Sequence, residues 1–274
     1  MMQAKRVWAM YWSATGTTKQ VVTTVAERMA AVLELPLERY DFTLPGAREA
    51  VPDFTAADVV VFGTPTYAGR VPNVLLKYLA VVQGNGAAAV PVVTFGNRAF
   101  DDSLIELRDI LRGNGFLPFA AAAFACEHSF STRLAAGRPD AEDLQLAERF
   151  AEQAAARVPS LTADIPVVAV PGRAPEERIY YQPRDRAGAP VDIRKVKPKT
   201  ADSCDDCGLC ALVCPMGSID PQHVRNYLGI CIKCGACIKK CPHGAKYYDD
   251  PGYLYHKTEL EEGYVRRAAV SLFV

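Results

Sequence analysis

The sequence lacks the features that carry a chain into or across a membrane. Its first residues predict a buried strand over residues 5–12 rather than a signal peptide. The longest uncharged apolar run, residues 116–126, is well short of the roughly 20 residues that a spanning helix needs. The formal net charge is zero, which gives no overall field to attract nucleic acid or a membrane surface. We therefore expect a cytoplasmic protein with neither kind of partner.

The short motifs of common nucleotide enzymes are also missing. The chain has no Gly-x-Gly-x-x-Gly dinucleotide fingerprint and no Gly-Lys-Ser/Thr of a nucleotide triphosphatase. No side chain stands out as a substrate acid or a nucleophile. The 274 residues are ordinary globular sequence, 50% hydrophobic and 23% charged, and their number suggests about two domains.

Cysteine, by contrast, is present in a repeated pattern. The motif C-x2-C-x2-C-x3-C-P occurs twice between residues 204 and 242. This spacing is typical of two 4Fe-4S clusters, in which the fourth cysteine of each copy completes the cluster of the other copy. The first set of ligands is then Cys204, Cys207, Cys210 and Cys241, and the second set is Cys231, Cys234, Cys237 and Cys214.

Other uses of these cysteines fit less well. A zinc ribbon would use four of them and leave four with matched spacing unexplained. A disulfide framework is expected in small exported proteins rather than in a chain of this size. Residues 203–246 resemble a bacterial two-cluster 4Fe-4S ferredoxin, and the repeat of residues 211–220 in residues 238–247 is part of that resemblance.

The N-terminal part reads as strand, hydroxyl-rich loop and helix. Unpaired N–H groups at a helix N-terminus favour phosphate, and loop hydroxyls add donors. The loop resembles the phosphate loop of flavodoxins, which implies that FMN is held by Ser13, Thr15, Gly16, Thr17 and Thr18. A helix with an ordinary N-cap after a turn would have a similar sequence.

Two more loops extend the flavodoxin resemblance. The β-branched run at residues 58–62 predicts a buried parallel strand, and ligands of such sheets bind beyond the carboxyl ends of the strands. The next loop is similar to the second FMN loop of flavodoxins, with Tyr67 against the flavin ring or, alternatively, packed in the core. The loop after strand 87–95 resembles that of fused flavodoxin and ferredoxin proteins. The implied cofactor residues are Thr64, Pro65, Thr66, Tyr67, Ala68 and Gly69, and then Phe95, Gly96, Asn97, Arg98 and Phe100.

Two side chains near this predicted site, Arg98 and His128, have two readings each, and a third, Cys126, has one. Arg98 places positive charge near the flavin or pairs with Asp101 or Asp102. His128 follows the fifth strand and supplies a proton near neutral pH, or it is a hydrogen-bonded structural histidine. Cys126 lies outside both motifs and reads as a small core residue.

The whole chain is thus predicted to be α/β. Residues 1–158 form a flavodoxin-like domain with a doubly wound, five-stranded parallel sheet. Residues 159–199 are a proline-rich linker packed on the surface, and residues 200–250 are a small α+β ferredoxin domain. The tail of residues 251–274 receives no role.

The resemblance implies an iron–sulfur flavoprotein with FMN and two 4Fe-4S clusters. We expect an electron-transfer protein or oxidoreductase that is fed by a ferredoxin-like carrier and serves an unidentified donor or acceptor. A basic stretch at residues 194–199 is a docking patch for an acidic carrier or simply a solvated segment. Two other hypotheses stay open, a redox-sensing interaction protein and a zinc-stapled binding module.

Overall fold

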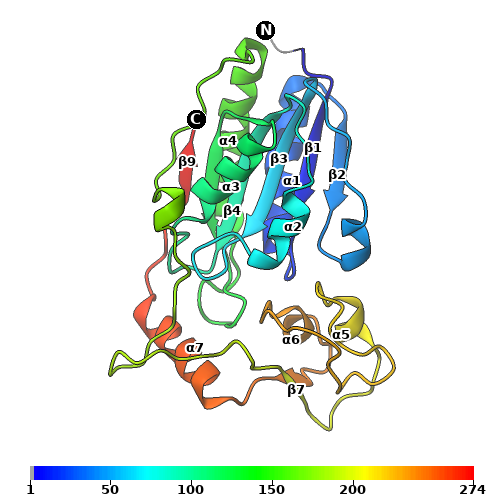
Figure 1. Cartoon of the computed structure of the whole chain (residues 1–274), viewed down its shortest axis with the longest axis vertical. Helices are drawn as coiled ribbons and strands as arrows, with labels where there is room; N and C mark the ends of the chain where they lie inside the picture. The colour runs from blue at the N-terminus through cyan, green and yellow to red at the C-terminus, as the bar shows by residue number, and fades with distance from the viewer. Residues whose placement is uncertain (1–2) are drawn as a thin grey trace.

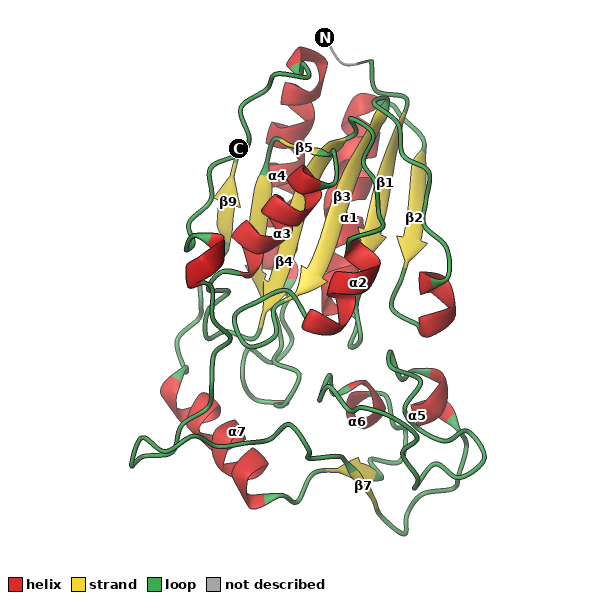
Figure 2. Ribbon diagram, viewed as in Figure 1, coloured by secondary structure: helices red, strands yellow, loops and turns green. Residues whose placement is uncertain are grey.

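A parallel sheet organises the N-terminal half of the chain (Figures 1 and 2). The computed structural model describes residues 3–274, and residues 1 and 2 of the predicted first domain lie outside this range. Five parallel strands lie side by side in the order β2 (Leu37–Asp41), β1 (Arg6–Tyr11), β3 (Asp58–Pro65), β4 (Ala88–Phe95) and β6 (Ala121–Ala125). This is the predicted flavodoxin-like α/β fold.

Helices cover both faces of this sheet. On one face lie α1 (Thr17–Leu33) and α4 (Ala141–Arg157), and on the other lie α2 (Leu76–Leu79) and α3 (Ser103–Gly113). Strand β3 shows why: Val59 and Val61 join one apolar core, Val60 and Phe62 join the other, and all four are fully buried. Alternate side chains of a central strand point to opposite faces, so a continuous apolar run fills both cores. Within residues 3–274, no helix is both long and apolar enough to cross a membrane.

Two segments of this domain are less regular than their apolar sequence suggests. The run of residues 116–126 is divided into β5 (Leu117–Pro118) and β6, and the register against β4 shifts by one residue between them, from Ala89 opposite Pro118 to Val92 opposite Ala122. Residues 72–82, which begin with a proline and are mostly apolar, form only a 3-10 turn (Asn73–Leu75) followed by the single α-turn of α2. The β-branched residues Val81 and Val82 follow it, and such residues are poor helix formers.

The C-terminal tail returns to the sheet, which the sequence did not predict. Strand β9 (Ser271–Phe273) pairs antiparallel with β6 at the edge of the sheet. Ahead of it, the amide of Asn97 donates to the carbonyl oxygens of Tyr264 (2.7 Å) and Arg266 (2.6 Å) and accepts from the N–H of Ala268 (3.1 Å). The tail is therefore part of the flavodoxin-like domain, although it follows the cysteine motifs.

Residues 159–198 cross the surface without strands and with only short 3-10 turns. Several contacts hold this segment to the flavodoxin-like domain. The N–H of Val168 donates to Pro118 O (3.0 Å), Arg173 pairs with the buried Asp102, and the N–H of Tyr181 donates to Ala68 O (2.8 Å). The linker is thus fixed along the face that carries α3 and ends close to the loops beyond the strands.

The cysteine-rich part is small and has few regular elements. Strands β7 (Lys199–Thr200) and β8 (Lys246–Tyr247) pair at its base, and the one-turn helices α5 (Leu209–Leu212) and α6 (Ala236–Lys239) follow matching glycines of the two repeats. Figure 1 shows this part opposite the carboxyl ends of the sheet strands, with α7 (Pro251–Gly263) beside it. The chain thus brings its two cofactor-binding motifs to one boundary.

The hydrogen bonds between Asn97 and the tail can be tested with the Asn97→Asp variant. Aspartate tolerates the left-handed backbone at this position (φ 65°), but its carboxylate cannot donate to Tyr264 O and Arg266 O. We expect a loss of roughly 1 to 3 kcal/mol in the free energy of unfolding, because two partly buried hydrogen bonds lose their donor. Limited proteolysis within residues 264–268 should become faster. The exposed Asn73→Asp variant is the control, and equal behaviour of the two variants would contradict the assignment.

Candidate functional site

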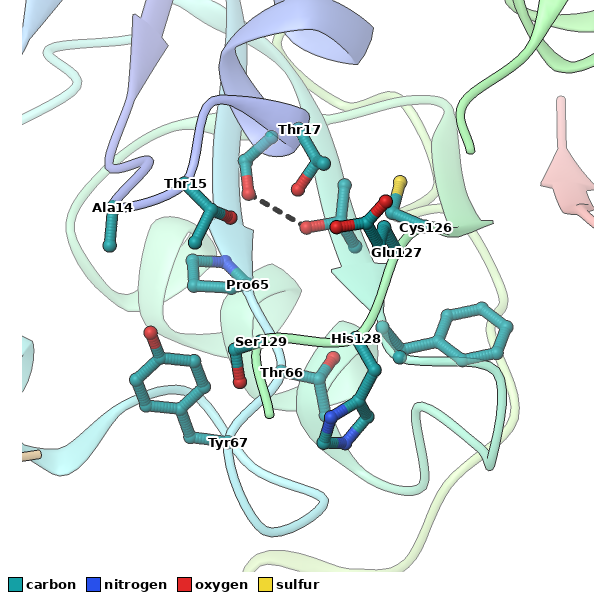
Figure 3. Close-up of a pocket in the computed structure, with 14 residues that line it drawn as sticks. Ala14, Thr15, Thr17, Pro65, Thr66, Tyr67, Cys126, Glu127, His128 and Ser129 are labelled. Carbon is teal, nitrogen blue, oxygen red and sulfur yellow. Dashed lines mark hydrogen bonds between the residues drawn. The ribbon is translucent and has the colours of Figure 1, made fainter. Parts of the chain in front are cut away.

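A pocket opens at the carboxyl ends of the parallel strands, where ligands of open α/β sheets bind (Figure 3). Its empty volume, including the open mouth, is about 430 Å³. The lining residues come from four loops, at residues 14–18, 65–67, 94–96 and 126–129. Three of these loops are the ones that the sequence predicted to bind FMN.

The first loop offers the chemistry of a phosphate site. Thr15 and Thr17 line the pocket, and Gly16 caps helix α1 in the left-handed region (φ 103°) with no side-chain cap. The oxygen of Ser13 lies deeper and accepts from the N–H of Lys19 (3.0 Å), which holds the loop on the helix. The described lining residues include no lysine or arginine. Hydroxyl groups and the helix terminus are therefore the donors available to a phosphate.

The second loop is a tight turn. The N–H and carbonyl groups of Tyr67 and Arg70 pair with each other (2.9 and 3.1 Å), and both Ala68 and Gly69 have positive φ. This is the geometry of a type I′ turn. The turn presents the ring of Tyr67 to the pocket, where it packs edge-on against Trp12 with ring centroids 5.8 Å apart. Burial and the nearby Cys234 and Cys231 raise the pKa of Tyr67, so its hydroxyl stays protonated.

Some of the residues predicted in the third loop line the pocket, and the others contact the tail or neighbouring side chains. Phe95 and Gly96 line the pocket, and a Cβ on Gly96 would lie 2.0 Å from the ring of His128, so only glycine fits beneath that ring. Asn97 holds the tail, as described above. Arg98 pairs with Asp101 and lies over the ring of Tyr181 (4.1 Å to the centroid), and Phe100 packs on Phe95. The ion-pair reading of Arg98 is thus the arrangement found.

His128 lines the pocket, but its surroundings argue against a proton donor that titrates near neutral pH. Burial, helped by Lys239, His256 and Arg98, lowers its pKa to about 3. Its Nδ1 accepts from the N–H of Phe130 (3.0 Å), so the proton of the neutral ring is on Nε2. The imidazole can therefore donate one hydrogen bond from Nε2 without carrying charge.

Some predicted residues lie behind the pocket wall and others were missed. Ser13, Thr64, Ala68 and Gly69 shape the loops but do not line the cavity, whereas Thr18 does and bonds to Thr94 (2.7 Å, the dashed line in Figure 3). The predicted cofactor residues did not include Ala14, Thr94, Cys126, Glu127 and Ser129. Their position at strand ends was the available signal, since every strand end of a parallel sheet meets the same edge.

The cysteines gather into two hollows. The first set, Cys204, Cys207, Cys210 and Cys241, lines one hollow, and the second set, Cys231, Cys234, Cys237 and Cys214, lines the other. Each hollow therefore takes three cysteines from one repeat and the fourth from the other, as the spacing suggested. Among residues 3–274, no three Cys, His, Asp or Glu side chains converge closely enough to hold one ion. Each set instead surrounds a space, an arrangement that fits a group of several atoms.

The second hollow adjoins the pocket. Gly235, inside its cysteine loop, is packed so closely that a Cβ would lie 2.5 Å from the carbonyl oxygen of Ser129, a pocket residue. Four residues further on, Lys239 donates to the carbonyl oxygens of His128 (2.7 Å) and Ser131 (3.0 Å) and pairs with Glu127. These contacts hold the second cysteine loop against the pocket wall.

Comparisons with known proteins agree with both parts of the chain. Residues 10–131 match the family described as NADPH-dependent FMN reductase, and residues 203–246 match the 4Fe-4S dicluster domain. Similar solved structures include an archaeal flavodoxin (15% identity, 56% of this chain and 99% of that chain, TM-score 0.40) and a flavodoxin from Streptococcus pneumonia TIGR4 (21%, 56% and 99%, 0.38). An apo NADH:FMN oxidoreductase is also similar (19%, 55% and 90%, 0.40). No curated protein sequence matched the chain.

The buried histidines should make the protein less stable in mild acid. The pKa values of His128 and His256, about 3 and about 4, lie below the unfolded value of about 6.5. Protonation therefore favours the unfolded chain, and stability is lost as the pH falls through 6.5. The expected slope is about 1.4 kcal/mol per pH unit for each histidine. Chemical denaturation from pH 7 to 5 measures it, and His256→Gln should reduce the slope. A profile that is flat over this range would contradict the two pKa values.

Proposed function

We propose that this chain, an electron-transfer oxidoreductase in which an FMN-reductase-type flavodoxin-like domain is joined to a 4Fe-4S domain, is a flavin reductase fed by a ferredoxin-like carrier. In this proposal the pocket binds FMN and each cysteine set binds one 4Fe-4S cluster. Electrons enter at the first set, continue through the second set and arrive in the pocket. The reducing cytoplasm is the compartment that suits such thiolate ligands.

The observation that carries the proposal is the contact between the second set and the pocket. Cys234 is buried in the same apolar core as Phe95 and Trp12, and the ring of Tyr67 packs against this core. Its loop touches Ser129 through Gly235. A one-electron centre at the second set and a flavin in the pocket would thus share one protein boundary, with little water between them.

The first set faces outward instead. Cys207 is exposed, whereas each cysteine of the second set is buried or partly buried. A protein carrier can therefore approach the first set without moving the flavodoxin-like domain. The difference between an open first set and a covered second set fits a path with one external end and one internal end.

When bound, FMN would accept electrons singly or in pairs, whereas each 4Fe-4S cluster would exchange one. The chain's own residues bind the flavin and surround it. In this proposal the hydroxyls of Thr15 and Thr17 and the α1 N-terminus hold the phosphate. The neutral His128 can donate a hydrogen bond from Nε2, and Tyr67 covers the side of the pocket toward Cys234.

The direct test is reduction under anaerobic conditions. Mixing the purified holoprotein with reduced low-potential ferredoxin should bleach the flavin absorbance. NADPH alone should act far more slowly, because the second cysteine loop packs on the pocket wall where a hydride donor would need access. Intact clusters with no flavin reduction by ferredoxin would instead favour a redox sensor. Zinc without sulfide or flavin in the purified protein would refute the proposal.

The exchanged fourth ligands give a second test. Cys214→Ala should remove about half of the iron and sulfide and block flavin reduction, although Cys214 belongs to the first sequence motif. Cys241→Ala, the matched change in the other motif, should remove the first cluster and leave the second in contact with the pocket. Iron, sulfide and rapid-mixing measurements compare the two. Cys214→Ala protein with both clusters and normal flavin reduction would show that the ligand sets are wrong.

A further inference from the structure

The two cysteine loops have the same backbone but carry opposite charges. Asp206 and Lys233 occupy the same place in the repeats, two residues after the first cysteine, and both have positive φ (56° and 55°). We infer that this charge difference makes the first set the harder one to reduce, so that electrons move from the first set to the second and on to the pocket. The inference rests on the proposed function and adds to it the order of the two reduction potentials and the side chains that set it.

The first set is bordered by carboxylates. Oδ1 of Asp206 lies 3.7 Å from Sγ of Cys204, and Asp205 accepts from the N–H of Cys207 (3.2 Å). A cluster-bound cysteine is a thiolate with no proton to donate, so the Asp206 carboxylate would face it as a like charge. Adding an electron near two carboxylates is unfavourable, and the net charge around a cluster is one of the factors that set its potential. His243 pairs with Asp205 (2.9 Å), which moderates that carboxylate but leaves Asp206 without a cationic partner in the described structure.

The second set is bordered by cations and a hydroxyl. Lys233 is buried and donates to the carbonyl oxygens of Cys231 (2.9 Å) and Arg194, both of which are neutral. Arg48 reaches over from the flavodoxin-like domain and donates to Pro215 O (2.7 Å), next to Cys214, and to two further carbonyls. The hydroxyl of Tyr248 lies 3.7 Å from Sγ of Cys231 and can donate to a thiolate. Each of these groups favours the reduced, more negative state.

Other charges do not reverse this difference. Lys246 is buried, lines the first hollow and acts on both Cys210 and Cys237, so it offsets part of the negative charge at the first set. Lys239 is near the second set but is paired with Glu127. The exposed Asp205 and Asp206 are screened by solvent, yet the short distance from Asp206 to Cys204 limits how much salt and water lie between them.

The electron balance needs only the carrier already named. A reduced low-potential one-electron carrier is oxidised once for each electron that enters at the first set. That electron then moves to the second set, and two such transfers supply the pair that FMN can hold. The charge pattern thus suits the chain to receiving electrons from outside rather than exporting them from the flavin.

The test is an anaerobic redox titration of the holoprotein, followed by electron paramagnetic resonance, with iron and sulfide content measured on each sample. We expect two potentials in the wild-type protein. Asp206→Asn should raise only the lower one, and Lys233→Gln should lower only the higher one. Each change should alter the partition of one electron between the sets by about tenfold, which is about 59 mV. Asparagine suits the positive φ of position 206, so its backbone is retained.

Asp202→Asn is the matched control, because it removes the same charge from an exposed residue with no contact to a cysteine among the described hydrogen bonds. It should shift the lower potential less than Asp206→Asn does. Two intact clusters whose higher potential responds to Asp206→Asn, or whose potentials ignore both substitutions, would overturn the gradient alone. Fewer than two clusters in the wild-type protein would overturn the proposed function as well.

Discussion

The structure depends on the close approach of two loops from different parts of the chain. Gly235 and Gly208 are equivalent in the repeat and share a left-handed backbone (φ 76° and 77°). A side chain on Gly208 would meet open space, whereas one on Gly235 would collide with Ser129. The left-handed glycine therefore forms the turn of the cysteine loop in both repeats. In the second repeat it also lets the loop dock on the pocket. That contact decides which cysteine set lies near the flavin site.

Small contacts of this kind would not hold two free proteins together for long, and here the chain supplies the rest. The linker is fixed before the cysteines by Tyr181 at Ala68, and the tail is fixed after them by Asn97 and strand β9. The cysteine-rich part is thus tethered at both of its ends to the same domain. Tethering makes docking an intramolecular event with a high effective concentration, so modest contacts such as Lys239 on Glu127 are sufficient.

Much of this could be predicted from local sequence. The β-branched run of β3, the hydroxyl loop before α1 and the cysteine spacing each report on a few neighbouring residues, and the structure brings them together as expected. The role of the tail could not be predicted, because β9 has only three residues and its partner is β6, far away in the sequence. The choice between the two readings of His128 could not be made from the sequence for a similar reason. Its pKa is set by burial and by Lys239, His256 and Arg98, none of which is a sequence neighbour.

A twofold repeat of cysteine loops does not by itself give an electron path a direction. A symmetric pair of cysteine loops would give two equivalent sites, and an electron would then have no preferred direction between them. In this chain the symmetry is kept in the backbone and in the ligand spacing but broken in the side chains, with Asp206 opposite Lys233. It is broken again in the surroundings, because the second set is held against the flavodoxin-like domain by Gly235 at Ser129 and by Pro215, next to Cys214, at Arg48. Both differences favour electron flow from the first set to the second, since the covered set is also the one with cationic neighbours.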